Sequence, residues 1–111
     1  MSDFVAVAKT SDIPPGQARY FELAGFPIAI CHVEDEGFFA IDDVCTHDGG
    51  PLDQGELEGD EIECPRHGAR FSVRTGAVLT LPAILPIHTY SVRVEDDVIY
   101  VNPIAHQLVG R

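Results

Sequence analysis

The chain has 111 residues, of which 45% are hydrophobic, and this size and composition suit one small domain with its own core rather than two. Acidic residues number 18 against 7 basic ones, and the formal net charge of −11 repels nucleic-acid phosphates and anionic lipid. No apolar run reaches the length of about 18 residues that a membrane-spanning helix needs. The first residues lack the basic and apolar segments of a signal peptide, so we expect a cytoplasmic protein.

Two hairpins are predicted along the chain. Residues 26–33 are rich in apolar and β-branched side chains, 34–37 have the composition of a turn, and 38–41 are predicted to return as a second strand. Near the C-terminus, residues 90–95 alternate apolar with polar side chains, and 98–101 follow after a short acidic turn. Because 8 prolines and 10 glycines interrupt the chain too often for long helices, we expect an all-β sandwich or small barrel.

Two short cysteine-histidine pairs, Cys45-Thr46-His47 and Cys64-Pro65-Arg66-His67, offer two thiolates and two imidazoles. Together these are enough to hold a metal centre, and the ligand types alone allow either zinc or an iron-sulfur cluster. Zinc fingers usually place two cysteines together and two histidines together, whereas each pair here contributes one of each. The spacing therefore favours the iron-sulfur interpretation.

This spacing resembles the Rieske pattern, Cys-x-His followed by Cys-x-x-His, in which two histidines replace two cysteines on one iron of a [2Fe-2S] cluster. The likeness extends over roughly residues 4–101, and the contexts 45–52 and 64–71 resemble the soluble ferredoxin branch of the family. Glycines near the two pairs and a Thr-Gly turn after the second add to it: Gly49, Gly50, Gly68 and Thr75-Gly76.

The resemblance implies a ligand set and a cofactor. It implies that Cys45 and Cys64 bind one iron of a single [2Fe-2S] cluster, and that His47 and His67 bind the other. It also implies an antiparallel β-sandwich or small barrel with a cluster-binding subdomain made of two loops.

The same resemblance gives the expected domain organisation. Residues 1–103 are expected to form a single Rieske [2Fe-2S] domain, followed by a C-terminal tail over 104–111. Within the domain, the cluster-binding loops are expected at about 43–52 and 62–72. A proline-bearing loop at about 80–86 resembles the one that covers the cluster in this family.

The branch of the family is indicated by residues that are missing. High-potential Rieske proteins carry an extra cysteine in each loop, and the matching positions here are Gly50 and Arg66. They also carry a serine and a tyrosine whose hydroxyls bond to sulfur, where this chain has Ala69 and Phe71. Fewer hydrogen bonds to sulfur leave the reduced state less stabilised, so we expect the low end of the Rieske range, roughly −150 mV.

The function implied by the resemblance is that of a one-electron carrier, not an enzyme. Such ferredoxins pass electrons from a flavin-dependent reductase to a terminal oxygenase, and we expect a monomer without nucleic-acid or membrane partners. Two alternatives remain: a non-catalytic Rieske small subunit of a larger reductase or oxygenase complex, and a structural zinc-binding module. The terminal acceptor and the pathway stay open, and iron-sulfur assembly is one possibility.

Other candidate residues are given ordinary roles. The third cysteine, Cys31, lies in an apolar run and is expected in the core. None of His32, His88 and His106 has a partner at metal-ligand spacing, so surface or packing roles are expected. The acidic connector 56–63 is either a docking surface for redox partners or a solvated loop.

Overall fold

The computed structural model of the protein describes residues 3–46, 49–65, 68–81 and 85–105. Within these ranges the secondary structure is β-strand, apart from one 3-10 helix, η1, at Thr10–Asp12. None of the described elements is a helix long and apolar enough to cross a membrane. The prediction of an all-β protein is confirmed.

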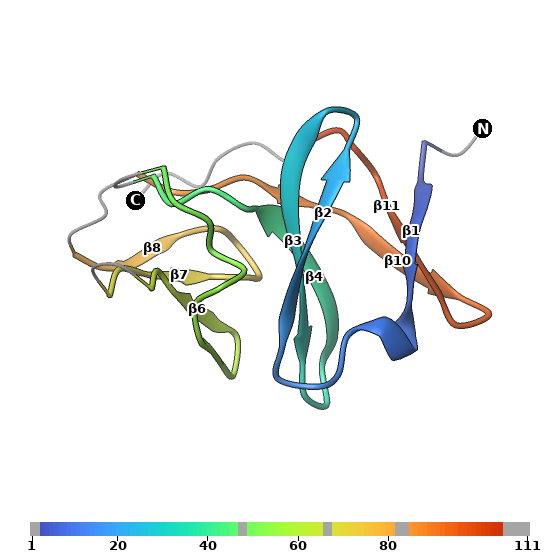
Figure 1. Ribbon diagram of the computed structural model, residues 1–111, viewed down its shortest axis with the longest axis horizontal. Coiled ribbons are helices and arrows are strands. Elements are labelled where there is room, and N and C mark those ends of the chain that lie inside the picture. Colours follow the sequence, from blue (N-terminus) through green and yellow to red (C-terminus); the bar gives the residue numbers. More distant parts are fainter. Residues whose placement is uncertain (1–2, 47–48, 66–67, 82–84, 106–111) are drawn as a thin grey trace.

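The strands form three antiparallel sheets that follow one another along the longest axis of the molecule (Figure 1). The outer sheet has the order β1 (Val5–Lys9), β11 (Val98–Val101), β10 (Val92–Glu95). The middle sheet has the order β2 (Ala18–Leu23), β3 (Phe26–Val33), β4 (Gly37–Asp42), β9 (Thr89–Tyr90). The third, which we call the cluster sheet, has the order β5 (Leu57–Glu58), β6 (Glu61–Glu63), β7 (Arg70–Ser72), β8 (Val78–Thr80).

Strand β3 contributes to two separate cores because its side chains alternate between the two faces of the middle sheet. Ala29, Cys31 and Val33 belong to the core shared with the cluster sheet, whereas Ile28 and Ile30 belong to the core shared with the outer sheet. Both faces are therefore covered, which explains why the strand reads as an almost continuous apolar run. The core role expected for Cys31 is confirmed, since its side chain is fully buried.

The two predicted hairpins are present, with one difference. Residues 26–33 and 38–41 correspond to β3 and β4, which pair antiparallel. The predicted strand 90–95 is divided: Tyr90 pairs with Ala40 of the middle sheet, and β10 begins only at Val92. Alternation continues through this break while the chain passes from one sheet to the next, so periodicity alone does not reveal the division.

Candidate metal centre

The first cluster loop follows β4 and is closed by two backbone hydrogen bonds. The N–H of Cys45 donates to the carbonyl oxygen of Gly50 at 2.8 Å, and the N–H of Gly49 donates back to the carbonyl of Cys45 at 2.7 Å. Gly49 has φ of 78°, a left-handed conformation that glycine adopts without a steric penalty. The loop therefore turns tightly around the cysteine.

The second cluster loop has the same frame at the same spacing. The N–H of Cys64 donates to the carbonyl oxygen of Ala69 at 2.7 Å, and the N–H of Gly68 donates to the carbonyl of Cys64 at 3.0 Å. Gly68 has φ of 79°, matching its counterpart in the first loop. The two loops therefore present their cysteines in the same local geometry, although the second loop is a β6–β7 hairpin and the first is not.

Both cysteines lie at the base of their loops outside any disulfide, with exposed fractions of 0% for Cys45 and 1% for Cys64. They belong to one apolar core cluster, which includes residues of both loops and of the cluster sheet. Because both cysteines are buried among apolar side chains, water is excluded from their sulfur atoms. His47 and His67 lie outside the described residues, and within the described part of the chain no three metal-binding side chains come together.

Asp43 joins the two ends of the first loop, a role that the sequence analysis missed. Its side chain is 3% exposed, and Oδ1 accepts the N–H groups of Leu52 and Asp53, each at 2.7 Å. The Oδ2 atom is buried without a hydrogen-bond partner among the described residues.

Burial is the main cause that raises the pKa of Asp43 to about 7, and the Asp53 side chain adds to the rise. The protonated form is thus favoured by folding. This contribution to stability is fully present below the ordinary value of 3.8 and is lost as the pH rises through about 7.

Three contacts anchor the chain that follows the predicted covering loop. The hydroxyl of Thr46, between the two predicted ligands of the first pair, donates to the carbonyl oxygen of Leu85 at 2.6 Å. The N–H of Ile87 donates to the carbonyl of Gly76 at 2.9 Å. Residues 82–84, the middle of that loop, lie outside the described residues.

His88 forms the third of these contacts, through Asp42 at the end of β4. Asp42 Oδ2 accepts the backbone N–H of His88 at 3.0 Å and lies 2.9 Å from its Nδ1, while Oδ1 accepts the Tyr90 hydroxyl at 2.6 Å. Burial, followed by the hydrogen bond to Asp42, raises the pKa of Tyr90. His32 is likewise structural: its Nδ1 lies 2.7 Å from the Ile13 carbonyl and its ring stacks on Phe38.

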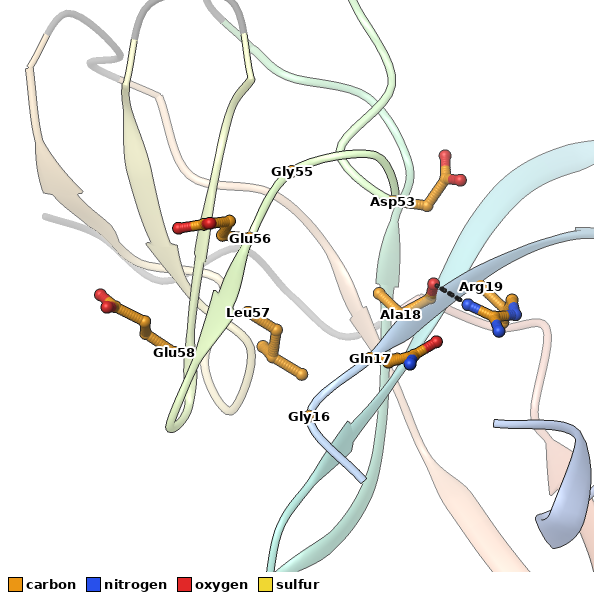
Figure 2. A pocket seen from close by; sticks show the side chains of 9 residues that line it. All are labelled: Gly16, Gln17, Ala18, Arg19, Asp53, Gly55, Glu56, Leu57 and Glu58. Atoms are coloured by element: carbon orange, nitrogen blue, oxygen red, sulfur yellow. Dashed lines mark hydrogen bonds between the residues drawn. The ribbon is translucent and has the colours of Figure 1, made fainter. Parts of the chain in front are cut away.

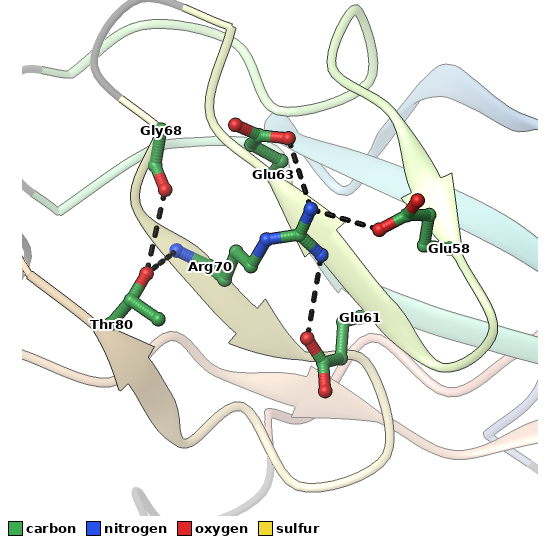
Figure 3. Close-up of polar contacts among 6 residues, drawn as sticks. All are labelled: Glu58, Glu61, Glu63, Gly68, Arg70 and Thr80. Carbon is green, nitrogen blue, oxygen red and sulfur yellow. Dashed lines mark hydrogen bonds and ion pairs between the residues drawn. The ribbon is translucent and has the colours of Figure 1, made fainter.

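Acidic side chains surround one arginine on the cluster sheet (Figure 3). The guanidinium of Arg70 lies 2.9 Å from Glu58, 3.3 Å from Glu63 and 3.4 Å from Glu61, measured between nitrogen and carboxylate oxygen. The hydrogen bond to Glu58 is the main cause that raises the pKa of Arg70 above its ordinary value. Three carboxylates around one cation leave this surface negative, and Glu63 directly precedes the ligand candidate Cys64.

A groove of about 480 Å³ lies between the middle sheet and β5 (Figure 2). The described residues that line it are Gly16, Gln17, Ala18, Arg19, Asp53, Gly55, Glu56, Leu57 and Glu58. None of these is a cysteine or a histidine, and in Figure 2 the side chain of Leu57 points toward β2 whereas those of Glu56 and Glu58 point away from it. The groove is therefore distinct from the cysteine-bearing loops.

Comparison with known proteins agrees with this geometry. The model of the Rieske [2Fe-2S] domain family matches residues 3–91. The ferredoxin component of biphenyl 2,3-dioxygenase from Rhodococcus jostii is 41% identical over 96 residues, covering 86% of this chain and 89% of that protein.

Two solved structures are also similar. One is a chain in the complex of reduced oxygenase and oxidized ferredoxin of carbazole 1,9a-dioxygenase: TM-score 0.88, 35% identity, 96% of this chain and 99% of that chain covered. The other is the ferredoxin of carbazole 1,9a-dioxygenase from Nocardioides aromaticivorans: TM-score 0.87, 36% identity, with coverages of 93% and 100%.

The fold and the paired cysteine loops define an all-β iron-sulfur protein. The chain belongs to the Rieske [2Fe-2S] domain family. Its cofactor is a [2Fe-2S] cluster, and the residues present fit that group, because two buried cysteines outside any disulfide, in matching loops, offer the soft ligands that such a cluster needs. Buried thiols suit zinc as well, and it is the match to the Rieske [2Fe-2S] family that decides against a structural zinc-binding module.

Proposed function

We propose that this protein is a one-electron carrier that receives electrons from a flavin-dependent reductase and delivers them to the terminal oxygenase of a ring-hydroxylating system. When bound, the [2Fe-2S] cluster supplies a one-electron couple. The observation that carries the proposal is the pair of matching loops, which offer Cys45 and Cys64 in the same hydrogen-bonded frame. Relatives that share 37–43% identity with the chain are named as ferredoxin components or subunits of dioxygenase systems.

Cys45, His47, Cys64 and His67 are proposed as the four ligands. The two cysteines hold one iron from the buried base of the loops, where water is excluded. His47 follows its cysteine by two residues and His67 by three, so in the sequence each histidine stands between its cysteine and the closing glycine, Gly49 or Gly68. Neutral imidazoles add less negative charge than thiolates, which makes the couple easier to reduce than one with four cysteines.

The acidic surface around Arg70 supports docking to basic partners. The formal net charge is −11, and Glu58, Glu61 and Glu63 concentrate part of it on the cluster sheet, next to the second loop. Charge complementarity mainly raises the rate of encounter between partners. We propose that the protein acts in the cytoplasm as a monomer that meets its reductase and oxygenase in turn.

An anaerobic mixing experiment tests the proposed function. The purified protein, reduced by a flavin-dependent ferredoxin reductase, is mixed with the oxidised oxygenase component of a ring-hydroxylating dioxygenase, and visible absorbance is followed by stopped flow. We expect one electron per chain to be accepted and then transferred. A protein that holds iron and sulfide but neither accepts an electron from reductases nor passes one to oxygenases contradicts the proposal. The Cys45→Ser variant serves as the control without an intact site.

A further inference from the structure

The two cluster loops differ in what holds their ends together. The second loop, residues 64–69, connects β6 to β7, and Glu63 pairs with Arg70 directly at its base. The first loop begins where β4 ends, at Asp42, and the next strand along the chain begins only at Leu57. Among the described residues, no strand ladder joins the two ends of the first loop.

The side chain of Asp43 connects the two ends of the first loop, where no strands pair. Its Oδ1 atom accepts two backbone N–H groups, from Leu52 and Asp53, both at 2.7 Å. These bonds join the chain two residues before Cys45 to the chain just beyond the closing Gly50. Both distances are short for N–H···O hydrogen bonds, and the accepting side chain lies in a nearly inaccessible position.

The second loop has no counterpart of this carboxylate. The corresponding position, two residues before Cys64, is Ile62, whose side chain is fully buried in β6. The backbone of Ile62 pairs with Phe71 on one side and with Leu57 on the other. A side-chain acceptor is unnecessary there because the strands already fix the ends of the loop.

The geometry points to Asp43 as a positioning residue of the cluster site, whose side chain closes the first loop and keeps Cys45 in a fixed place relative to Cys64. This inference rests on the proposed ligand set, because the position of Cys45 matters only if its sulfur binds iron. Without the acceptor, the N–H groups of Leu52 and Asp53 lose their partner, and the returning end of the loop is free to move away from β4.

Three variants separate the hydrogen bonds from the charge. Asp43→Ala removes both. Asp43→Asn removes the charge but keeps an oxygen that can accept the two N–H groups. Asp53→Asn removes a neighbouring charge and keeps the side chain of Asp43 as the acceptor. Release of iron to a chelator is followed anaerobically by absorbance. We expect release from Asp43→Ala to be about tenfold faster than from the native protein, and release from the other two variants to stay within about threefold.

The paramagnetic resonance spectrum of the reduced proteins gives a signature that a general loss of stability does not produce. The Rieske signal is expected to broaden in Asp43→Ala, because Cys45 takes more than one place, and to keep its native shape in Asp43→Asn. Native-like release and line shape in Asp43→Ala overturn the inference. Iron release from Asp43→Asn or Asp53→Asn that is about tenfold faster than from the native protein also overturns it, because the effect would then come from charge.

Hydrogen exchange decides the question if Asp43→Ala does not fold. The amides of Leu52 and Asp53 should exchange slowly in the native protein and in Asp43→Asn. Fast exchange in either protein contradicts the proposed role of the Asp43 side chain in closing the loop. This measurement does not require a bound cluster. A native protein without iron and sulfide overturns the proposed function, whereas the exchange rates still test the role of Asp43.

Discussion

At the scale of single residues, two side chains beside the second cysteine set the polarity of the site. Ala69 and Phe71 are fully buried, and the carbonyl of Ala69 accepts the N–H of Cys64 at 2.7 Å. Neither side chain carries a hydroxyl, so neither can donate a hydrogen bond to sulfur. If the resemblance to high-potential Rieske proteins holds at these positions, the electron-rich reduced state lacks the two donors that the resemblance implies there.

Adding those donors should raise the reduction potential. Ala69→Ser and Phe71→Tyr each introduce one hydroxyl, and a modest hydrogen bond of about 1 kcal/mol favours the reduced state. For a one-electron couple, a tenfold change in equilibrium is about 59 mV, so each variant should shift the potential upward by tens of millivolts. Voltammetry measures the shift, and Phe39→Tyr, which adds the same oxygen in β4, is the control. Intact clusters with unchanged potentials in both variants would contradict the match of Ala69 and Phe71 to the serine and tyrosine of high-potential Rieske proteins.

Gly76 illustrates a second constraint at this scale. Its φ is 80°, and a methyl group in its place would overlap the carbonyl oxygen of Ile87. The carbonyl of Gly76 also accepts the Ile87 N–H at 2.9 Å, so this close approach anchors the chain just before β9.

Gly76→Ala should destabilise the fold more than Gly25→Ala does. Gly25 has a similar φ of 85° with open space around the methyl position, so its substitution costs only backbone strain, about 1–2 kcal/mol. At Gly76 the overlap adds to that strain, and the unfolding midpoint should fall further by several degrees. Equal midpoints for the two alanine variants would mean that the contact with Ile87 is unimportant.

At the scale of elements, two adjacent aspartates hold different segments: Asp42 is the last residue of β4 and Asp43 follows it. Asp42 binds His88 and Tyr90 at the start of β9, whereas Asp43 binds the return of the first loop. Successive residues of an extended chain point to opposite sides, so one short stretch can anchor two parts of the cluster site.

The Tyr90 hydroxyl should contribute measurably to this anchoring. Its bond to the Asp42 carboxylate is 2.6 Å long, and hydrogen bonds to charged groups contribute about 1.5–3 kcal/mol. Tyr90→Phe should lower the free energy of unfolding by roughly that amount in denaturant titrations, while Tyr20→Phe, at a side chain 52% exposed, should change it by less than about 0.5 kcal/mol. Similar losses of unfolding free energy in both variants would contradict a stabilising contribution of the hydrogen bond between Tyr90 and Asp42.

The same bond has a pH dependence of known sign. Because the pKa of Tyr90 is raised, folding favours the neutral phenol, so the contribution is complete below the ordinary value of 10.0 and is lost as the pH rises through the higher folded value. The stability difference between the native protein and Tyr90→Phe should therefore stay constant from neutral pH to about 10 and shrink above it.

The sequence predicted β3, β4, β10 and β11, and missed β1, the six-residue β2 and the short strands of the cluster sheet. Strand β3 has eight residues and a strong apolar signal, whereas β5 has two and β6 and β7 have three each. Alternation over so few residues cannot be distinguished from a loop. Strand β1 pairs with β11 at the other end of the chain, and no local pattern reveals such a partner.

The site was predictable where chemistry restricts residue type and unpredictable where it does not. Two cysteine-histidine pairs at Rieske spacing indicate a metal centre because few other functions need them. Asp42 and Asp43 were missed because an acidic residue is usually exposed, and only the fold shows that both are part of hydrogen-bonded anchors. Gly68, one of the glycines that add to the family resemblance, has φ of 79°, a conformation that glycine adopts without a steric penalty.

At the scale of the whole molecule, the acidic charge is distributed over both ends of the long axis. Glu58 and Glu61 lie on the cluster sheet, and Asp96 and Asp97 lie in the turn between β10 and β11 at the opposite end (Figure 1). Only the first pair lies on the sheet that carries the second cluster loop, so the two pairs allow position to be separated from total charge.

Electron transfer to a basic partner should slow with salt and with removal of the nearer charges. Glu58→Gln/Glu61→Gln should reduce the second-order rate at low ionic strength by several-fold, and the difference should fade once the Debye length drops below about 10 Å near 0.1 M salt. Asp96→Asn/Asp97→Asn changes the net charge equally and should have a smaller effect. Stopped-flow rates over a salt series provide the measurement; equal slowing by both double variants would show that net charge alone matters.

The most direct test of the ligand set is the electron paramagnetic resonance spectrum of the reduced protein. We expect the low-average-g signal of a [2Fe-2S] cluster with two histidine ligands, lost in His47→Ala and in His67→Ala and intact in His88→Ala. An unchanged signal in His67→Ala, or a native spectrum typical of four cysteine ligands, would contradict the assignment of Cys45, His47, Cys64 and His67.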